Sequence, residues 1–156
     1  MGMNEQGFMS EALRLAREGI ARHHGGPFGA VLVVDNQIVG RGWNQVVLRN
    51  DPTAHAEILA IREACQQLGR FHLTGASLFT SCEPCPMCLS ASYWARIDRI
   101  LYAATTLDVQ GIGFDDQRIR DALSGSGPAI PMQQLLREES LEILQAWRDD
   151  TASISY

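Results

Sequence analysis

The sequence predicts an α/β fold of three layers, in which helices cover both faces of a mixed sheet of five strands. The first observation behind this prediction is that apolar, β-branched runs alternate with longer segments whose apolar residues recur at helical spacing. The second is a strand, a helix and a strand in succession over residues 76–104, which implies a right-handed crossover and a parallel pair. A length of 156 residues without repeats or low-complexity linkers suits a single domain over residues 1–156.

The first predicted elements are a helix and a hairpin. Residues 4–22 predict a helix, because apolar residues recur there at helical spacing with charged residues between them. The run GAVLVVD at 29–35 predicts a strand, and IVGRGWN at 38–44 predicts its return. Asp35 and Asn36 lie between the two runs and favour a turn, so the strands should pair as a hairpin.

The middle of the chain predicts two helices, each followed by a strand. These elements are a helix from 51–53 to 68, a strand at 76–81, a helix from 86 to about 95 and a strand at 97–104. Either Asp51 or Thr53 should cap the first helix, and Gly69 should end it. Pro86 suits the first turn of the second helix, because a proline there loses no hydrogen bond.

The last part of the chain mixes polar loops with short elements. Residues 105–128 are polar and rich in Gly and Asp, with a short helix expected near 117–123. IPMQQLLR at 130–137 predicts the fifth strand, and a final helix should cover about 139–149.

Composition and charge limit the class of protein. Apolar residues make up 46% of the chain and charged residues 20%, which is typical of a soluble globular protein. The net charge of −5 disfavours a nucleic-acid partner, because an acidic surface repels phosphate. No apolar run is long enough for a bilayer, and MGMNEQGF at the start lacks the features of a signal peptide. We therefore expect a cytoplasmic protein with no membrane partner, whose clustered cysteines bind metal rather than form disulfides.

Two short motifs at the start of predicted helices suggest a metal centre. HAE begins at His55, and PCPMC contains Cys85 and Cys88. The dipole at a helix N-terminus favours thiolate, and one histidine with two thiolates would give zinc three protein ligands. Zinc sites with three protein ligands leave a fourth position for water, which marks a catalytic site. Glu57, beside one candidate ligand, could then move protons.

Cys82 lies three residues before Cys85, the same spacing that separates Cys85 from Cys88. TSCEPCPMC therefore contains two possible C-x-x-C pairs, Cys82 with Cys85 and Cys85 with Cys88. Pro86 favours a helix start that puts the second pair at the helix edge and first turn, where both sulfurs can face one metal. Cys82 comes at the end of a strand, and we interpret it as a bystander that packs near the site.

The order His-x-Glu and then Pro-Cys-x-x-Cys is typical of zinc-dependent nucleobase deaminases. The sequence thus resembles the cytidine and deoxycytidylate deaminase superfamily, and most closely its bacterial guanine deaminases. The segments that carry the closer resemblance are GGPFGA (25–30), NDPTAHAE (50–57), TSCEPCPMC (80–88), YWAR (93–96), GFDD (113–116) and AWR (146–148). The resemblance implies a cytidine deaminase-like fold and conversion of guanine to xanthine and ammonia, a reaction of purine metabolism.

The resemblance also implies roles for the four residues of the candidate centre. His55, Cys85 and Cys88 would hold one zinc ion per subunit, and Glu57 would shuttle protons. Guanine carries its amino group on C2, so the carboxyl would deliver a proton to N3 and then help to protonate the departing amine.

Further residues are implied to contact the nucleobase substrate. Phe28 and Asn44 fall where the family packs against and hydrogen-bonds the base, and Asp116 falls where it contacts the substrate. The family forms homodimers that exchange a C-terminal segment, here about 130–156. Tyr156 would then help to close the partner's site.

Several of these residues also have purely structural interpretations. Phe28 could fill the core, and Asn44 could initiate a turn at the end of its strand. Asp115 could cap the helix expected at 117, and the last residue of the chain could simply be frayed. Trp94 could line the pocket or pack behind its helix.

Three other functions fit parts of the pattern. A tRNA adenosine deaminase shares the His, Glu and paired Cys, but it should carry a basic face, which the net charge of −5 disfavours. A non-catalytic zinc module would need neither Glu57 nor an open ligand position. A deaminase of another flat aminated heterocycle, such as cytosine, a pterin or an aminotriazine, would use the same chemistry.

Overall fold

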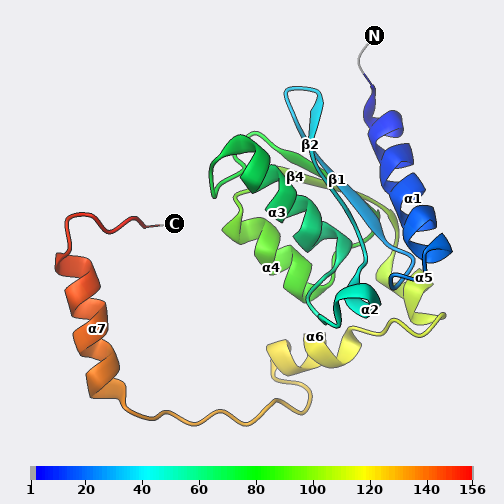
Figure 1. Ribbon diagram of the computed structural model, residues 1–156. Helices are drawn as coiled ribbons and strands as arrows, with labels where there is room; N and C mark the ends of the chain where they lie inside the picture. Colours follow the sequence, from blue (N-terminus) through cyan, green and yellow to red (C-terminus); the bar gives the residue numbers. More distant parts are fainter. Residues whose placement is uncertain (1–2, 156) are drawn as a thin grey trace.

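Four strands form a mixed sheet in the order β2-β1-β3-β4 in the computed structural model, which describes residues 3–155 (Figure 1). The strands are β1 Gly29–Val34, β2 Gln37–Trp43, β3 Ser77–Cys82 and β4 Arg99–Ala104. β1 runs antiparallel to β2 and to β3, whereas β3 runs parallel to β4. The predicted hairpin and the predicted parallel pair are therefore confirmed. Asp35 and Asn36 turn the hairpin with positive φ angles of 47° and 60°.

Helices cover both faces of this sheet, which confirms the predicted three layers. α1 (Glu5–Ala21) packs on β1, β2 and β3, and its apolar cluster is Phe8, Leu15, Val31, Val33 and Phe79. α3 (Ala56–Leu68) packs on β2 and β1, with α4 (Pro86–Trp94) beside it. The cluster on this side is Ala30, Leu32, Val39, Ala56, Ala60, Ala64, Leu73, Ala76, Leu78 and Ala95. Successive residues of a strand face opposite sides, so the odd-numbered residues of β1 pack into one core and the even-numbered residues pack into the other.

The backbone of α3 lies directly against β2. A Cβ atom at Gly40 would lie 2.2 Å from the carbonyl oxygen of Ala60, and one at Gly42 would lie 2.1 Å from that of Ala56. Because side-chain atoms do not approach a carbonyl so closely, only glycine fits at these positions. The contact fixes the first turn of α3 at the end of β2.

The start of α3 differs from the sequence-based prediction. The helix begins at Ala56 with His55 as N-cap, so the prediction of a start at 51–53 is wrong. Oδ1 of Asp51 accepts hydrogen bonds from the amide and the hydroxyl of Thr53, at 2.8 Å and 2.7 Å. These bonds make a local turn that competes with the helix. α2 (Val46–Arg49), which the sequence did not predict, occupies part of the same connection.

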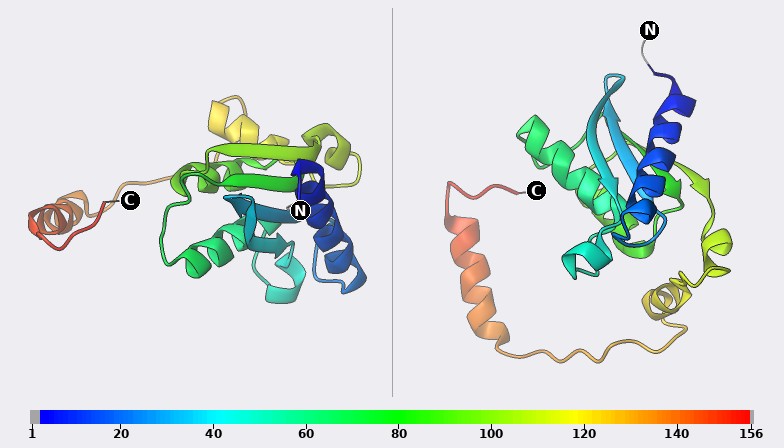
Figure 2. Two further views of the ribbon diagram at one scale, coloured as in Figure 1. Left: turned by 90° about the horizontal axis from the view of Figure 1, so that it is seen from above. Right: turned by 45° about the vertical axis from the view of Figure 1, so that its right-hand side comes forward.

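The chain beyond β4 departs most from the prediction. It contains α5 (Thr106–Gln110), α6 (Gln117–Ser124) and α7 (Arg137–Asp149), which confirms the helices expected near 117–123 and 139–149. The predicted strand at 130–137 is wrong, and within the described residues the sheet has four strands rather than five. A strand needs a neighbouring edge to bond with, and this segment leads away from the sheet (Figure 2).

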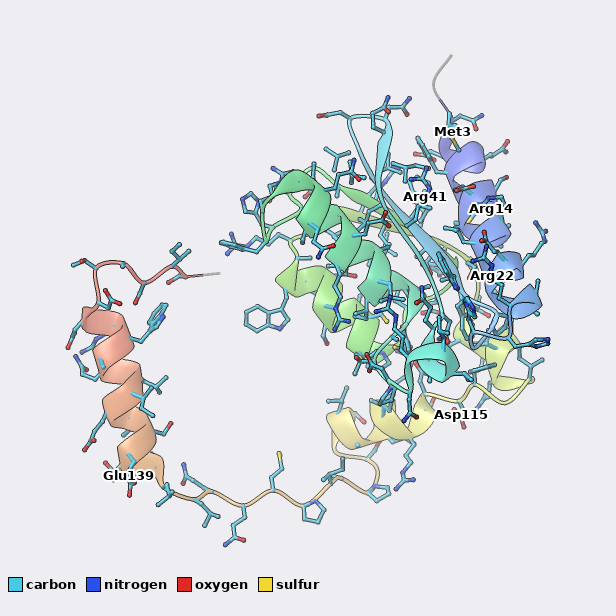
Figure 3. The ribbon with its side chains drawn as sticks, viewed as in Figure 1. Met3, Arg14, Arg22, Arg41, Asp115 and Glu139 are labelled. Atoms are coloured by element: carbon cyan, nitrogen blue, oxygen red, sulfur yellow. The ribbon has the colours of Figure 1, made fainter. Side chains whose placement is uncertain are left out.

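We call residues 128–155 the C-terminal arm. Every residue from 128 to 152 is exposed, including Leu141, Ile143, Leu144 and Trp147 of α7. Figure 3 shows the side chains of α7 projecting into open space around the helix. An amphipathic helix normally buries its apolar side, so the apolar side of this one needs a cover from elsewhere. Within residues 3–155, no helix has both the length and the apolar character that crossing a bilayer requires.

Candidate active site

Two helix N-termini bring the candidate metal ligands together. His55 is the N-cap of α3 and Cys85 is the N-cap of α4, and both have an extended backbone. His55 makes no side-chain cap hydrogen bond to α3, and the Cys85 side chain faces His55 from the end of α4. Pro86 holds the first position of α4, as predicted, and Cys88 falls in its first turn.

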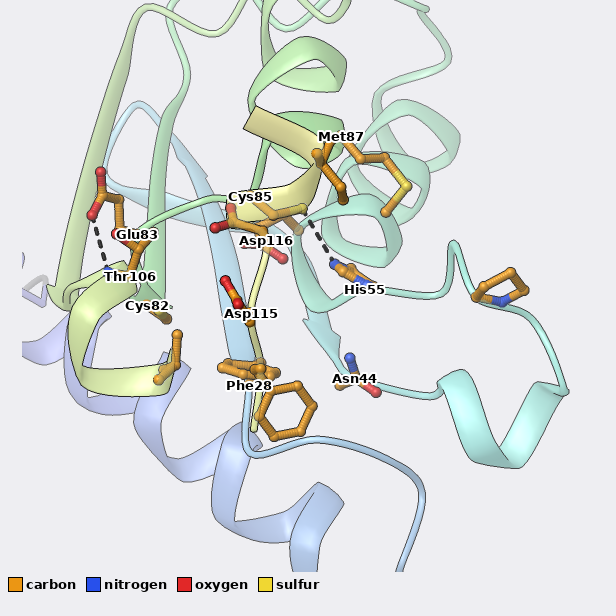
Figure 4. A pocket seen from close by; sticks show the side chains of 15 residues that line it. Phe28, Asn44, His55, Cys82, Glu83, Cys85, Met87, Thr106, Asp115 and Asp116 are labelled. Atoms are coloured by element: carbon orange, nitrogen blue, oxygen red, sulfur yellow. Dashed lines mark hydrogen bonds between the residues drawn. The ribbon is translucent and has the colours of Figure 1, made fainter. Parts of the chain in front are cut away.

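His55, Cys85 and Cys88 present a compact set of donor atoms. Their candidate ligand atoms all lie within 4.8 Å of one another. Nδ1 of His55 lies 3.6 Å from Sγ of Cys85 (Figure 4). It lies 3.5 Å from Sγ of Cys88. One imidazole nitrogen and two sulfurs suit zinc. Cys82 lies outside this set: its Sγ donates to the carbonyl oxygen of Thr105 at 3.7 Å, and burial raises its pKa to about 11.

The protonation states of the three donors are linked. The interaction of the two sulfurs lowers the pKa of Cys85 and raises the pKa of Cys88. A hydrogen bond with Cys85 raises the pKa of His55. A divalent cation fits this donor set, because it would neutralise two thiolates that burial disfavours.

Glu57 lies beside the donor set with its carboxyl buried. The residue is 6% exposed. The hydroxyl of Thr80 donates to Oε1 at 3.5 Å, and Sγ of Cys88 donates to Oε2 at 3.4 Å. Burial raises the pKa of Glu57, so this carboxyl retains a proton more readily than an ordinary glutamate. A buried carboxyl next to a candidate metal centre can both hold and release a proton.

A cavity of about 270 Å³ opens next to the donor set. Phe28 lines it and makes a T-shaped contact with Phe114, with ring centroids 4.9 Å apart and planes at 84°. Asn44 is buried, and its Oδ1 accepts hydrogen bonds from the amides of Gly26 at 3.0 Å and Val46 at 3.2 Å. The NH₂ group of Asn44 therefore faces the cavity (Figure 4).

The N-terminus of α6 forms another part of the cavity wall. Oδ1 of Asp115 accepts a hydrogen bond from the amide of Gln117 at 2.9 Å, so Asp115 stabilises the helix start, as one interpretation of the sequence expected. Asp116 makes no side-chain bond to the helix end, and its carboxylate pairs with Arg120 at 2.8 Å. Both aspartates line the cavity.

The structure places most of the candidate residues at one site. His55, Glu57 and Cys85 line the cavity together with Phe28, Asn44 and Asp116, and the buried Cys88 completes the donor set. Tyr156 lies outside the described residues. Trp94 is 68% exposed and is not among the residues that line the cavity.

Sequence reasoning missed three residues of this site. Thr80, which bonds Glu57, could have been found as a polar residue in phase with the inward-facing Leu78 of β3. Phe114 directly precedes the aspartate pair in GFDD. Glu83 lies within TSCEPCPMC, and its Oε2 accepts a hydrogen bond from the amide at the start of α5 at 3.1 Å.

Comparison with known proteins agrees with this geometry. Residues 3–104 match the family model described as the cytidine and deoxycytidylate deaminase zinc-binding region. The chain is 48% identical to the guanine deaminase of Bacillus subtilis over 149 residues, which cover 94% of this chain and 96% of that protein. The X-ray structure of guanine deaminase from Bacillus subtilis matches with a TM-score of 0.92 and 47% identity, covering 99% of both chains.

A second group of relatives matches only part of the chain. The tRNA-specific adenosine deaminase of Agrobacterium fabrum is 47% identical over 97 residues, which cover 62% of this chain and 63% of that protein. Similarity over the full length, including the segments that follow β4, distinguishes the first relative from the second. The chain therefore belongs to the cytidine and deoxycytidylate deaminase family, and within it to the group of the bacterial guanine deaminases.

Proposed function

We propose that the protein deaminates guanine to xanthine and ammonia, with one zinc ion held in each subunit by His55, Cys85 and Cys88. The observation that carries the proposal is that Glu57, a buried carboxyl, shares one cavity with His55, Cys85 and the aromatic side chain of Phe28, and that the buried Cys88 completes the donor set. Similarity to the guanine deaminase of Bacillus subtilis over 94% of the chain supports guanine as the base.

Glu57 carries out the proton transfers of the reaction. When bound, zinc supplies a Lewis acid that lowers the pKa of water and favours its addition to a ring carbon. As water adds to C2 of guanine, Glu57 takes a proton from the water and delivers it to N3. It then takes a second proton from the new C2 hydroxyl and passes it to the amine, the bond between C2 and the amine breaks, and ammonia leaves as the C2 carbonyl forms. Thr80 holds Oε1 in place through these transfers.

The rest of the cavity binds the flat base. Phe28 and Phe114 supply aromatic surface that can pack against a planar ring. Asn44 offers its NH₂ group, since its oxygen is already bonded to two backbone amides. Asp116 offers carboxylate oxygens to N–H groups, of which guanine has several.

We further propose that the chain forms a single domain. We also propose that two chains form a homodimer in which each C-terminal arm packs against the other chain. The exposed apolar side chains of α7 and the free edge of β4 support this arrangement, because each lacks a cover among residues 3–155 of the same chain. Tyr156 would then reach the partner's cavity. A cytoplasmic location fits as well, because zinc-binding thiols must stay reduced.

Ammonia release from the purified, zinc-loaded protein tests the proposed reaction. Guanine, adenine, cytosine and their nucleosides would be supplied at equal concentration. Guanine should give xanthine and ammonia in equal amounts, and the other bases should give little or none. Ammonia from adenosine or cytosine but none from guanine would contradict the proposal. Light scattering on the same sample tests the dimer, which should have twice the mass of the chain.

A further inference from the structure

Arg120 makes a two-point ion pair with Asp116. The two residues are four positions apart, at the start of α6 and one turn into it. Nε of Arg120 donates to Oδ1 at 3.2 Å, and Nη2 donates to Oδ2 at 2.8 Å. The side chains are 34% and 20% exposed, so the pair is partly shielded from water. A guanidinium that contacts both oxygens fixes the orientation of a carboxylate, which a single contact does not do.

The carboxylate that Arg120 holds belongs to the cavity wall. Asp116 lines the cavity with Phe28, Asn44 and His55. Stabilising the helix start does not occupy this carboxylate, because Asp115 makes the bond to the amide of Gln117. The pairing therefore does more than close a helix turn: it sets the direction of a charged group that faces the cavity.

A carboxylate held in this way can still accept more hydrogen bonds. Its two oxygens offer about four acceptor positions, and the guanidinium occupies one on each oxygen. The remaining positions can accept N–H groups of a base. Asp116 also raises the pKa of Arg120, so the guanidinium stays charged and keeps both contacts.

We propose that Arg120 is a positioning residue for base recognition, which fixes the carboxylate of Asp116 so that both of its oxygens can accept N–H groups of guanine. The inference rests on the proposed function and extends it to a residue that does not itself line the cavity. Arg120 would act on the binding of the base and leave the proton transfers of Glu57 unchanged.

Steady-state kinetics with guanine test this role. Arg120→Ala and Arg120→Gln should raise KM about tenfold, the size expected for one lost bond to a charged group, with kcat within about twofold. Arg120→Lys should recover only part of the loss, because an ammonium cannot make the two-point contact. Arg118→Ala is the matched control: it removes an exposed arginine from the same helix and should leave both constants unchanged. Zinc content and melting temperature would be measured for every variant.

A double-mutant cycle separates positioning from helix stability. Asp116→Ala should raise KM, and adding Arg120→Ala to it should change nothing further. Arg120→Gln with normal zinc, normal melting temperature and a KM within about twofold of the wild type would overturn the inference while leaving the proposed function standing. An equally large effect of Arg120→Ala in the Asp116→Ala background would also overturn it. If the wild-type protein released no ammonia from guanine, both proposals would fall together.

Discussion

Residues 3–104 and the C-terminal arm deal with apolar surface in opposite ways. The first part packs it into two cores, one on each face of the sheet. The arm exposes four large apolar side chains on one short helix. The candidate metal donors and Glu57 all belong to the part that contains the two cores, whereas Asp116 and Phe114 come from the connection to the arm. The proposed proton transfers therefore depend on a part of the chain with a packed core. The proposed recognition of the base depends partly on the segment that leads to the exposed arm.

The largest loss of activity should come from substituting a candidate metal ligand in residues 3–104. Cys85→Ser and Cys88→Ser should each lose bound zinc and all measurable turnover, because a hydroxyl is a poor zinc ligand. Metal analysis and ammonia release check this. Cys82→Ser is the matched control and should keep zinc at full stoichiometry. Loss of zinc from this variant would show that the donor set was wrongly assigned.

The next largest effect should come from Glu57→Gln, which removes the proton carrier but keeps the shape of the side chain. Turnover should fall by roughly 10²–10⁴, the usual contribution of general acid–base catalysis. Zinc content and thermal unfolding should stay close to those of the wild type. Glu63→Gln, an exposed change on the same helix, should leave turnover intact. A fully active Glu57→Gln variant would contradict the proposed mechanism.

Truncating one leucine in each part tests the comparison directly. Leu32→Ala in the core should lower the free energy of unfolding by about 2–5 kcal/mol, because it leaves a cavity among buried side chains. Leu144→Ala in the arm should change it by less than about 1 kcal/mol within one chain, since that side chain is 59% exposed. Denaturant unfolding at low protein concentration measures both.

The same Leu144→Ala variant should weaken the homodimer. Light scattering over a range of concentrations should show dissociation at a higher protein concentration than for the wild type. Equal dissociation of the two proteins would mean that α7 is not part of the dimer interface.

The smallest loss of activity should come from substituting Tyr156, the last residue of the chain. Tyr156→Ala should lower kcat/KM for guanine several-fold without changing the mass in solution, because the ring would help only to close the partner's cavity. Tyr156→Phe should recover most of the loss if the ring supplies the contact. Kinetics identical to those of the wild type would remove this residue from the site.

The sequence predicted elements well where they depend on nearby residues. The spacing of apolar residues predicted α1, and Pro86 marked the start of α4. The start of α3 could not be found in this way. The Asp-Pro-Thr segment looks like a helix cap, but the position of the helix depends on its contact with Gly40 and Gly42. The expected fifth strand failed for a related reason: its residues suit a strand, but no sheet edge within residues 3–155 lies beside them.

The candidate site shows the same division. The metal donors and Glu57 belong to short motifs, so the residue types and spacing were enough to suggest their chemistry. Thr80, Phe114 and Arg120 act through contacts between segments that are distant in sequence or through a side-chain direction on a short helix. No local pattern encodes such contacts, so only the three-dimensional arrangement reveals them.

Gly42 carries no side chain, yet it limits how this protein can diversify. It holds Ala56, the residue between His55 and Glu57, against the sheet with no room for even a methyl group. α3, which carries His55 and Glu57 at its start, therefore cannot shift relative to β2. A substitution at Gly42 would disturb both the packing of the sheet and the position of these two residues. None of the glycines described after β4 would place a Cβ within 3 Å of another residue's backbone. We expect substitutions that change the substrate to occur in the segments after β4. His55 and Glu57 would keep their positions through the contact of α3 with β2.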